Sequence, residues 1–349
     1  MNRQAIFWTN LISVVLFTNL THGSLQAAGL PAGFRISTLA RVPNARSITV
    51  CGNTLFVGTT QSSVYAVSLK AGNRVKRVLN DLAVPNGVAC HRDRLYVALK
   101  DRISSWPIHP SGDLAGPKAD IMTGLPNKEH HGRRYIRFGP DGKLYLSVGT
   151  PCNICWPRGL QGSILRMNPD GTGREVIATG IRNAVGFDWN PSTQTLFFTD
   201  NGADGMGVNT PPDELNEIKQ IGTWFGFPFF GGADRLPEFD TKPPVRQQTP
   251  PVFNFPAHVA PLGIHFYRGS LLPREYRGSA LVAEHNNPAR SDASSHQIVF
   301  VRFENGHPIS REVFATGLGP PVDIKELSDG SILVSSDMQG IIYRITYGQ

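Results

Sequence analysis

A short phrase recurs six times along the chain and restricts the fold more than any other feature. Each copy starts with an apolar patch, passes through a turn such as Pro140-Asp141-Gly142, and continues into an apolar run such as residues 144–149. The copies lie around residues 48–58, 87–99, 136–149, 185–200, 263–284 and 322–337. Repeats of about 40–50 residues built from short strands are typical of propeller blades. The sequence therefore predicts an all-β fold, a six-bladed β-propeller.

Such a ring uses residues 29–349 as one domain. Glycine (36 residues) and proline (27) suit turn-rich β structure rather than disorder, because 40% of the residues are hydrophobic and only 17% are charged. Residues 33–39 are expected to form a lone strand that joins the last blade beside residues 340–347. That pairing closes the ring and covers the exposed sheet edges.

The first 28 residues have the features of a secretory signal peptide. Arg3 supplies a positive charge, residues 5–17 are largely apolar, and the small residues Ala27 and Ala28 follow. The alternative is an uncleaved membrane anchor, but the apolar run is shorter than the roughly 20 residues that a span needs. We expect a periplasmic or secreted protein whose mature chain has no integral membrane segment.

The four cysteines fit an exported, oxidised protein. Cys51 and Cys90 occupy corresponding places in the first two repeats, where neighbouring blades would hold them within disulfide reach. Cys152 and Cys155 lie in a predicted loop, residues 150–162. A zinc site would need two more ligands at matching spacing, and a redox-active pair would need a following helix. We favour a local disulfide that braces the loop.

The net charge limits the kinds of partner. It is +7, and the signal peptide holds one arginine and no acid, which leaves +6 on the mature chain. This mild excess favours anionic partners such as a carboxylated cofactor. The basic residues are scattered and form no stripe interleaved with aromatics, so nucleic-acid binding is not expected.

Polar segments flank the phrase in repeats three to five, which also carry the long loops. His131 has a side chain that can take a proton from a hydroxyl near neutral pH; the alternative is a solvated polar loop. Arg182 offers a planar fork for a carboxylate, and Asn183 can both donate and accept. The alternative for this pair is hydrogen bonding between blades.

Residues 199–204 and 211–216 offer carboxylates, an amide and backbone carbonyls, the hard oxygen ligands that calcium prefers. Their spacing is not that of an EF-hand. We expect a helical turn at residues 212–218, with Asp213 and Asn216 as helix caps and loop braces rather than metal ligands. The loop at residues 284–296 adds polar groups and one cation, Arg290, at the end of a blade; the alternative is an ordinary surface loop.

Taken in order, these segments resemble the soluble quinoprotein glucose/sorbosone dehydrogenase family. The matching features are His131 eight residues before the Gly of Gly139-Pro140-Asp141, Gly-x-Arg-Asn at 180–183, Asn201-Gly202, Asp-Glu-Leu-Asn at 213–216 and the aromatic-Gly-aromatic-Pro of 225–228. The sequences at residues 152–155, 199–202 and 283–285 are more similar to those of the sorbosone branch. The resemblance covers nearly all of the mature chain and implies a six-bladed propeller that uses pyrroloquinoline quinone (PQQ) and calcium.

The resemblance also implies a role for each matched residue. His131 is the general base toward the sugar hydroxyl, and Arg182 stabilises charge on the quinone oxygen. The other implied site residues are the cofactor contacts Asn183, Asn201 and Arg290, and the calcium ligands Gly202 and Ala203, which act through their backbone carbonyls.

Two positions depart from the family pattern. The glucose branch pairs its histidine with an Asp where this chain has Thr150, so we expect His131 to be less strongly oriented and less basic. A cofactor-binding Arg ahead of the last blade is replaced by Pro320, which cannot pair with a carboxylate.

The expected activity is oxidation of an aldose, an aldosone or a related sugar by an exported PQQ- and calcium-dependent dehydrogenase. Trp156 follows Cys155, so the chain lacks a haem-attachment Cys-x-x-Cys-His, and electrons would leave through an external periplasmic acceptor. One alternative is a propeller binding module without catalysis, which Thr150 and Pro320 favour. The other is a calcium-dependent lactonase-type hydrolase with Asn86, Asn183, Asn201 and Asp323 as ligands.

Overall fold

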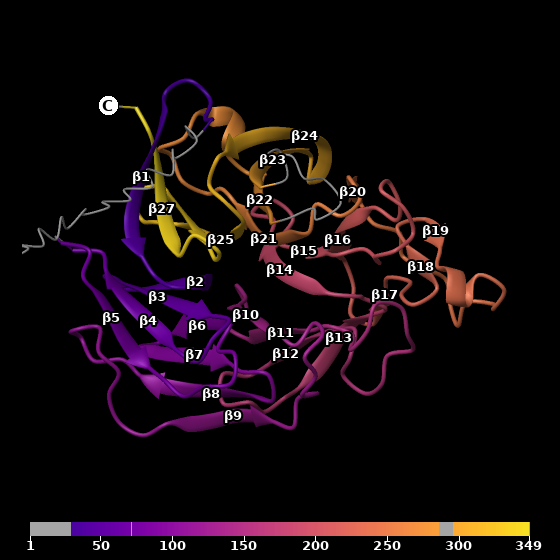
Figure 1. Cartoon of the computed structure of the whole chain (residues 1–349), viewed down its shortest axis with the longest axis horizontal. Coiled ribbons are helices and arrows are strands. Elements are labelled where there is room, and N and C mark those ends of the chain that lie inside the picture. The colour runs from indigo at the N-terminus through magenta and orange to yellow at the C-terminus, as the bar shows by residue number, and fades with distance from the viewer. Residues whose placement is uncertain (1–28, 71, 286–295, 349) are drawn as a thin grey trace, which may run out of the picture.

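The computed structural model describes residues 29–70, 72–285 and 296–348, which form six main β-sheets arranged around a common centre (Figure 1). The signal peptide and Arg290 lie outside the described residues. The helices of the described part are two 3-10 turns, η1 (Pro237–Phe239) and η2 (Arg274–Tyr276). None of the helices there is long and apolar enough to cross a membrane. The predicted all-β, six-bladed propeller is confirmed.

The first three blades are built from consecutive strands. Blade 1 contains β2 (Ala45–Cys51), β3 (Thr54–Thr59), β4 (Val64–Ser68) and β5 (Val75–Leu79). Blade 2 contains β6 (Gly87–His91), β7 (Arg94–Ala98), β8 (Arg102–Pro107) and β9 (Ala119–Thr123). Blade 3 contains β10 (Tyr135–Phe138), β11 (Leu144–Val148), β12 (Ser163–Met167) and β13 (Glu175–Thr179), and β17 (Thr223–Trp224) extends its outer edge.

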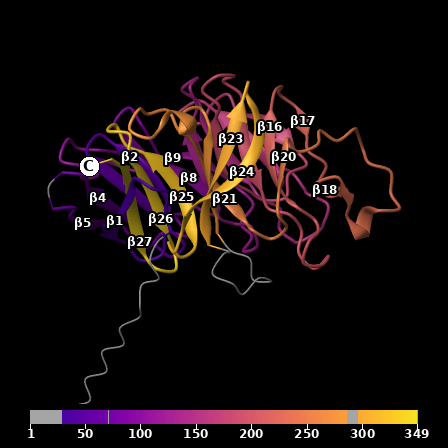
Figure 2. The ribbon, with the colours of Figure 1, turned by 90° about the horizontal axis from the view of Figure 1, so that it is seen from above.

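The last three blades carry the long connections. Blade 4 contains β14 (Ala184–Trp189), β15 (Leu196–Asp200), β16 (Asp213–Ile218) and β20 (Phe253–Phe255). Blade 5 contains β21 (Pro261–Phe266), β22 (Ala280–Glu284), β23 (Gln297–Glu304) and β24 (His307–Thr316), and blade 6 contains β25 (Pro321–Glu326), β26 (Ile332–Ser336) and β27 (Ile341–Tyr347). The insertion between β16 and β20 carries the hairpin β18 (Phe230–Gly231) and β19 (Asp234–Arg235) and extends from the ring (Figure 2).

The recurring phrase corresponds to the first two strands of each blade. The first strands β2, β6, β10, β14, β21 and β25 contact one another in a closed cycle and so form the innermost layer. Their backbones approach closely: a Cβ on Gly186 would lie 2.3 Å from the carbonyl oxygen of Leu262, and one on Gly263 would lie 2.7 Å from the Asp323 Cα. Glycine is required where two backbones come this near.

The ring is closed by the first described strand, as predicted. β1 (Phe34–Arg41) pairs antiparallel with β27 and becomes the outer strand of blade 6. The two strands, indigo and yellow, lie side by side in Figure 1. Phe34 packs edge-on against Tyr276, Phe314 and Tyr347, with ring centroids 4.9–5.3 Å apart. The strand therefore carries a buried aromatic anchor as well as its hydrogen bonds.

The predicted helical turn at residues 212–218 is wrong, because this segment is the strand β16. Pro211 and Pro212 before an acidic residue resemble the start of a helix. However, β16 pairs with β15 on one side and β20 on the other, and all six of its residues are buried. Pairing within the sheet outweighs local propensity here.

The cysteines pair as expected. Cys51–Cys90 joins blades 1 and 2 with a Cα–Cα distance of 5.8 Å, and Cys152–Cys155 closes a local loop at 6.1 Å. No free cysteine occurs in the part of the chain that the structure describes.

Charged side chains fill the ring near the ends of four adjacent inner strands. Arg137, Asp188, His265 and Lys325 are each the second-last residue of their strand. Asp188 is fully buried and lies 3.0 Å from an Arg137 nitrogen and 3.4 Å from His265 Nδ1. Lys325 has no ion pair within 4 Å among the described residues, although burial and the nearby Arg137 lower its pKa to about 8.

Candidate functional site

The predicted site residues meet at one end of the ring, where the inner strands begin. His131 lies four residues before β10, Arg182 and Asn183 directly precede β14, and Asn201 directly follows β15. A Cβ on Gly149 would lie 2.6 Å from the His131 Cβ and 2.9 Å from Asn183 Oδ1, so both residues flank the same stretch of backbone. Arg182 and Asn183 both hydrogen-bond to Asn201. Blades 3 and 4 therefore bring these four residues together.

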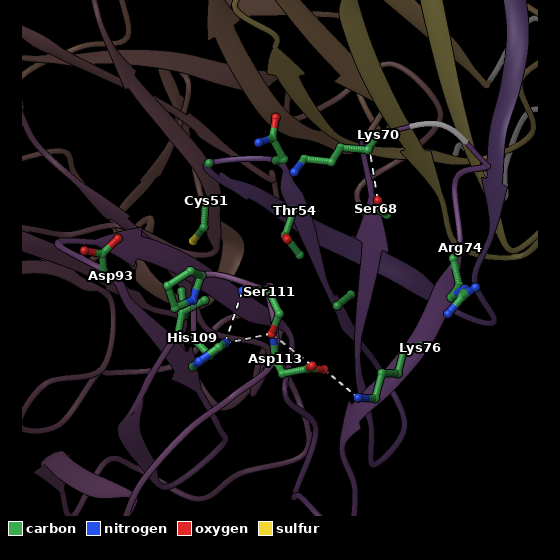
Figure 3. Close-up of a pocket in the computed structure, with 16 residues that line it drawn as sticks. Cys51, Thr54, Ser68, Lys70, Arg74, Lys76, Asp93, His109, Ser111 and Asp113 are labelled. Carbon is green, nitrogen blue, oxygen red and sulfur yellow. Dashed lines mark hydrogen bonds and ion pairs between the residues drawn. The ribbon is translucent and has the colours of Figure 1, made fainter.

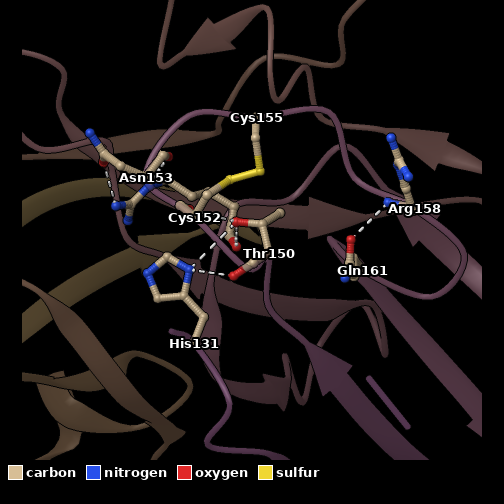
Figure 4. The surroundings of a disulfide bond; sticks show 8 residues. His131, Thr150, Cys152, Asn153, Cys155, Arg158 and Gln161 are labelled. Carbon is tan, nitrogen blue, oxygen red and sulfur yellow. Dashed lines mark hydrogen bonds between the residues drawn. A yellow bond between two sulfur atoms is a disulfide. The ribbon is translucent and has the colours of Figure 1, made fainter. Parts of the chain in front are cut away.

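His131 is oriented by a backbone group. Its Nδ1 lies 2.9 Å from the carbonyl oxygen of Thr150, as Figure 4 shows. A carbonyl oxygen only accepts, so Nδ1 carries the proton and Nε2 presents a lone pair. The Asp of the glucose branch is absent, and a backbone carbonyl orients the ring in its place.

The electrostatics around His131 keep its ring neutral. Burial, the Arg182 guanidinium and the neighbouring His130 lower the pKa of His131 to about 2, against the opposing hydrogen bond to Thr150. The expected loss of basicity is therefore present. His131 also has a φ of 50°, in the left-handed region. Strained backbone of this kind in a non-glycine residue occurs often at functional sites.

The loop that carries His131 is not a loose polar loop. Arg134 is buried inside it and donates to the carbonyl oxygens of Lys100, His131 and Pro126. A guanidinium has donors enough to brace several carbonyls at once. Sequence reasoning missed this role, because nothing in the run His-His-Gly-Arg-Arg distinguishes the buried arginine from the exposed one.

Arg182 is buried and holds two loops together. It donates from Nε and Nη2 to the carbonyl and side-chain oxygens of Asn153, and from Nη1 and Nη2 to Asn201 O and Asp204 Oδ2, at 2.8–3.1 Å. Hydrogen bonding between blades, the alternative reading of this arginine, thus accounts for four of its five N–H groups. One N–H and the positive charge remain for another partner.

The candidate calcium ligands lie next to this arginine. Asn201 accepts from Asn183 Nδ2 at 3.2 Å and donates to Pro261 O at 2.9 Å, so both amides are positioned. The carbonyl oxygens of Gly202 and Ala203 accept no hydrogen bond from any described residue. Two adjacent free carbonyls fit a hard cation such as calcium.

Buried acids surround these carbonyls. Asp213 accepts from the backbone N–H groups of Gly202 (2.6 Å) and Ala260 (2.8 Å), which confirms its expected role as a loop brace but not as a helix cap. Burial raises the pKa of Asp213 to about 6 and also raises that of Asp200, where the neighbouring Glu214 adds to the effect. Among the described residues, no cluster of three His, Cys, Asp or Glu side chains can hold a metal. A cation here would therefore rely on backbone oxygens and on its cofactor.

A second polar network lies at the same end of the ring, and two of its members, Arg46 and Asp337, were missed by sequence reasoning. Arg46 donates to Asn86 Oδ1 at 3.0 Å and to Asp337 Oδ2 at 2.7 Å. His285 Nε2 lies 3.1 Å from the same Asp337 carboxylate. The available signal was position in the repeat: Asp337 follows the second strand of blade 6 just as Asn201 follows that of blade 4. The network brings a buried cation to a site whose expected arginine is replaced by Pro320.

The ligands required by the lactonase reading do not converge. Asn86 is engaged by Arg46 and donates to the carbonyl of Arg134 at 2.7 Å. Asp323 is buried within the inner strands, where it accepts from the N–H of Ile48 at 2.9 Å and from the Tyr135 hydroxyl at 3.4 Å. Both side chains are used by the fold, so no four-ligand calcium site of that kind is formed.

A cavity of about 690 Å³ lies away from the predicted site (Figure 3). It adjoins the turn after Cys51, at the end of the ring opposite the starts of the inner strands. Lys70, Arg74 and Lys76 line it, and Lys76 forms an ion pair with Asp113. It contains none of the predicted site residues. Beside Arg182 the hollow is only about 10 Å³.

Comparison with known proteins identifies the family and agrees with the fold. The Glucose / Sorbosone dehydrogenase family profile matches residues 118–344, well over half of the chain. An uncharacterised protein of Borreliella burgdorferi is 33% identical in a match that is 346 residues long. The match covers 91% of this chain and 90% of that protein. The six-bladed propeller and the family match together support a sugar oxidoreductase in general. The chain belongs to the glucose/sorbosone dehydrogenase family.

Solved structures share the architecture at low sequence identity. The calcium structure of a Trichoderma reesei carbohydrate-active enzyme of family AA12 has a TM-score of 0.80 at 18% identity, covering 92% of this chain and 97% of that one. The PQQ domain of Coprinopsis cinerea pyranose dehydrogenase, in its holo form, has a TM-score of 0.77 at 19% identity, with 91% and 97% covered. The soluble aldose sugar dehydrogenase of Escherichia coli has a TM-score of 0.71 at 14% identity, with 90% and 99% covered.

Proposed function

We propose that this chain is an exported, PQQ- and calcium-dependent dehydrogenase that oxidises an aldose, an aldosone or a related sugar. The observation that carries the proposal is the hydrogen bond between His131 Nδ1 and the Thr150 carbonyl, which leaves Nε2 as an acceptor beside Arg182. Family membership supports sugar oxidation in general, and two of the structural neighbours are described as the holo form of a PQQ domain and as a calcium structure.

The residues present offer hydrogen-bond donors and free carbonyl oxygens whose chemistry suits both groups. Gly202 and Ala203 would hold calcium through their free carbonyls, and Arg182, Asn183 and Asn201 would contact PQQ. When bound, PQQ supplies a two-electron hydride acceptor and calcium a Lewis acid that polarises it. Arg290, by its place in the sequence, remains a further proposed contact for a cofactor carboxylate.

In this mechanism His131 Nε2 takes the proton of the sugar hydroxyl at the carbon that loses hydride. The positive charge that forms on the imidazole is shared with the Thr150 carbonyl through Nδ1–H. Arg182 contributes its remaining N–H and its charge at the acceptor side, where negative charge develops. Arg134 fixes the loop so that the base does not drift. Electrons then leave to an external periplasmic acceptor.

The test starts with mature protein stripped by a chelator. PQQ and calcium are added singly and together, and two readouts are followed: PQQ retained after gel filtration, and dye reduction with a panel of aldoses and aldosones. We expect retention and turnover only when both are present. A protein that neither retains PQQ nor oxidises any sugar would reject the proposal. The substitution at Pro320 would then mark a binding module without catalysis.

A further inference from the structure

An aromatic cleft of about 200 Å³ lies beside the candidate site. Trp156 and Gln161 reach it from the loop at residues 150–162, and Trp224, Val245 and Arg246 from the insertion of blade 4. Trp156 is 51% exposed and Val245 is 60% exposed. Two large apolar side chains from separate loops therefore face water at the same cleft. Exposed apolar surface gathered in a concave place marks a binding groove.

The cleft has a rigid aromatic base. Trp156 packs edge-on against the buried Phe229 with ring centroids 5.7 Å apart, and Phe239 lies 6.2 Å away. Trp224 is buried behind them, and the Arg246 guanidinium lies 5.9 Å from its ring. The exposed indole is thus held in place rather than free to rotate away.

The same loop connects the cleft to the catalytic histidine. The Thr150 carbonyl holds His131, and Trp156 follows directly after Cys155. Because the disulfide fixes the Cα atoms of Cys152 and Cys155 at 6.1 Å, chain geometry keeps Trp156 within about 17 Å of Thr150. The cleft also shares Gly180 and Phe227 with the small hollow beside Arg182.

The lining suits a sugar ring. A pyranose has an apolar C–H face that packs on a flat aromatic surface, and hydroxyls at its edge that need hydrogen-bond partners. Gln161 accepts from the N–H of Arg158 through Oε1 at 2.9 Å, so its amide N–H groups remain available to a ligand (Figure 4). Arg246 adds donors whose bonds within the described chain are long, at 3.3 and 3.4 Å.

We propose that this cleft is a glycan-binding subsite in which Trp156 packs against one sugar unit while another unit of the same chain reaches His131. The inference rests on the proposed function and deepens it, because it assigns short oligosaccharides rather than free monosaccharides as the preferred substrates. The occupant is a carbohydrate and not a protein, since stable protein interfaces bury about 800 Å² on each partner and the cleft holds only one ring.

The test is a calorimetric titration of the full mature chain, stripped of PQQ and calcium, with glucose, maltotriose, cellotriose, xylotriose and chitotriose. We expect at least one trisaccharide to bind about tenfold more tightly than glucose. Trp156→Ala removes that difference and Trp156→Phe keeps part of it. Met338→Ala, which shortens a side chain that is 79% exposed, changes nothing. An unchanged thermal midpoint shows that the variants are folded.

Equal binding of glucose and every trisaccharide would overturn the subsite, and so would a Trp156→Ala variant that binds as tightly as the wild type. If Trp156→Ala slowed only the reduction of a protein electron acceptor, the surface would belong to that acceptor and the proposal would fall. The titration needs no turnover. Tight trisaccharide binding without PQQ uptake rejects the dehydrogenase alone, whereas sugar oxidation without trisaccharide preference rejects the subsite alone.

Discussion

At the scale of single residues, His131 owes its state to a backbone carbonyl rather than to a carboxylate. The Thr150 carbonyl fixes the tautomer, and the positive Arg182 nearby opposes protonation. A carboxylate partner would raise the pKa of the imidazole, whereas this arrangement lowers it. The ring is therefore neutral near pH 7 and can accept a proton, although its low pKa also makes it a weak base.

The pH dependence of turnover tests this state. Because the pKa of His131 is lowered to about 2, the ring is deprotonated at every pH above that value, and a rise to pH 8 gains no further base. We expect kcat/KM to show no inflection near 6.5. His131→Ala should lower kcat by about 10²–10⁴-fold, whereas His109→Ala, at the distant cavity, should not. A step near 6.5 that His131→Gln removes would contradict this description.

Lys325 gives a second prediction, concerning stability. Its pKa falls from 10.5 to about 8 on folding, so the folded state releases the proton first and stability rises with pH between about 8 and 10.5. Below pH 8 the charged form costs on the order of 3 kcal/mol. Lys325→Met should therefore raise the free energy of unfolding at pH 7 and abolish that rise. Denaturant titrations at pH 7 and 10 measure the free energy of unfolding and its rise with pH, with the exposed Lys70→Met as the control. A Lys325→Met protein that is less stable than the wild type at pH 7 would refute the argument.

Sequence reasoning identified site residues that lie next to the ends of strands. It did not identify the groups that hold those residues in position through hydrogen bonds. His131, Arg182, Asn183 and Asn201 were found because they stand beside copies of the recurring phrase and match the family pattern. Arg46 and Asp337 were not, because their contact depends on blade 1 meeting blade 6 across 291 positions of sequence. Contacts of that range have no local signature.

At the scale of elements, the loop at residues 150–162 combines several tasks. It presents the carbonyl that orients His131, and Asn153 within it binds Arg182 and the N–H of Asp204. The Cys pair in this loop was predicted correctly as a brace, since four residues can close on themselves without help from the rest of the fold. The strand β16 was not predicted correctly. Its partners β15 and β20 lie on both sides of it, and this pairing is visible only in the folded sheet.

The two disulfides should contribute differently. In the chain-entropy description, stabilisation grows with the number of residues enclosed: about 4 kcal/mol for Cys51–Cys90, separated by 39, and about 2 kcal/mol for Cys152–Cys155, separated by 3. We expect the first double serine variant to lose more unfolding free energy in urea. The second should lose more turnover than stability, because it loosens Thr150. Equal losses in both measurements would show that the loop is held by other contacts.

At the scale of the whole molecule, one strand determines whether the ring is closed. β1 covers the outer edge of β27, and Phe34 is buried among three aromatic rings. The predicted ring closure was recoverable from sequence because a propeller has no other place for a strand that precedes its first blade.

Phe34→Ala should therefore lower the free energy of unfolding by about 3–5 kcal/mol. The matched control is Val313→Ala on the neighbouring β24, where the side chain is 52% exposed and little burial is lost. Urea unfolding measures the difference, and limited proteolysis should show early cleavage near β1 in the first variant only. A Phe34→Ala protein as stable as the control would mean that backbone pairing alone closes the ring.

The closing strand also sets the order of events when the protein is made. β1 leaves the ribosome before the other strands of the ring, but its partner β27 is made last. Blades 1 to 5 contain only strands between the two, so they can form as the chain emerges, whereas blade 6 waits for the final residues. Until then both sheet edges are uncovered. A chain that is stopped before β27 would leave these edges exposed permanently, so finished and unfinished copies differ in the sheet edges that they present to other proteins.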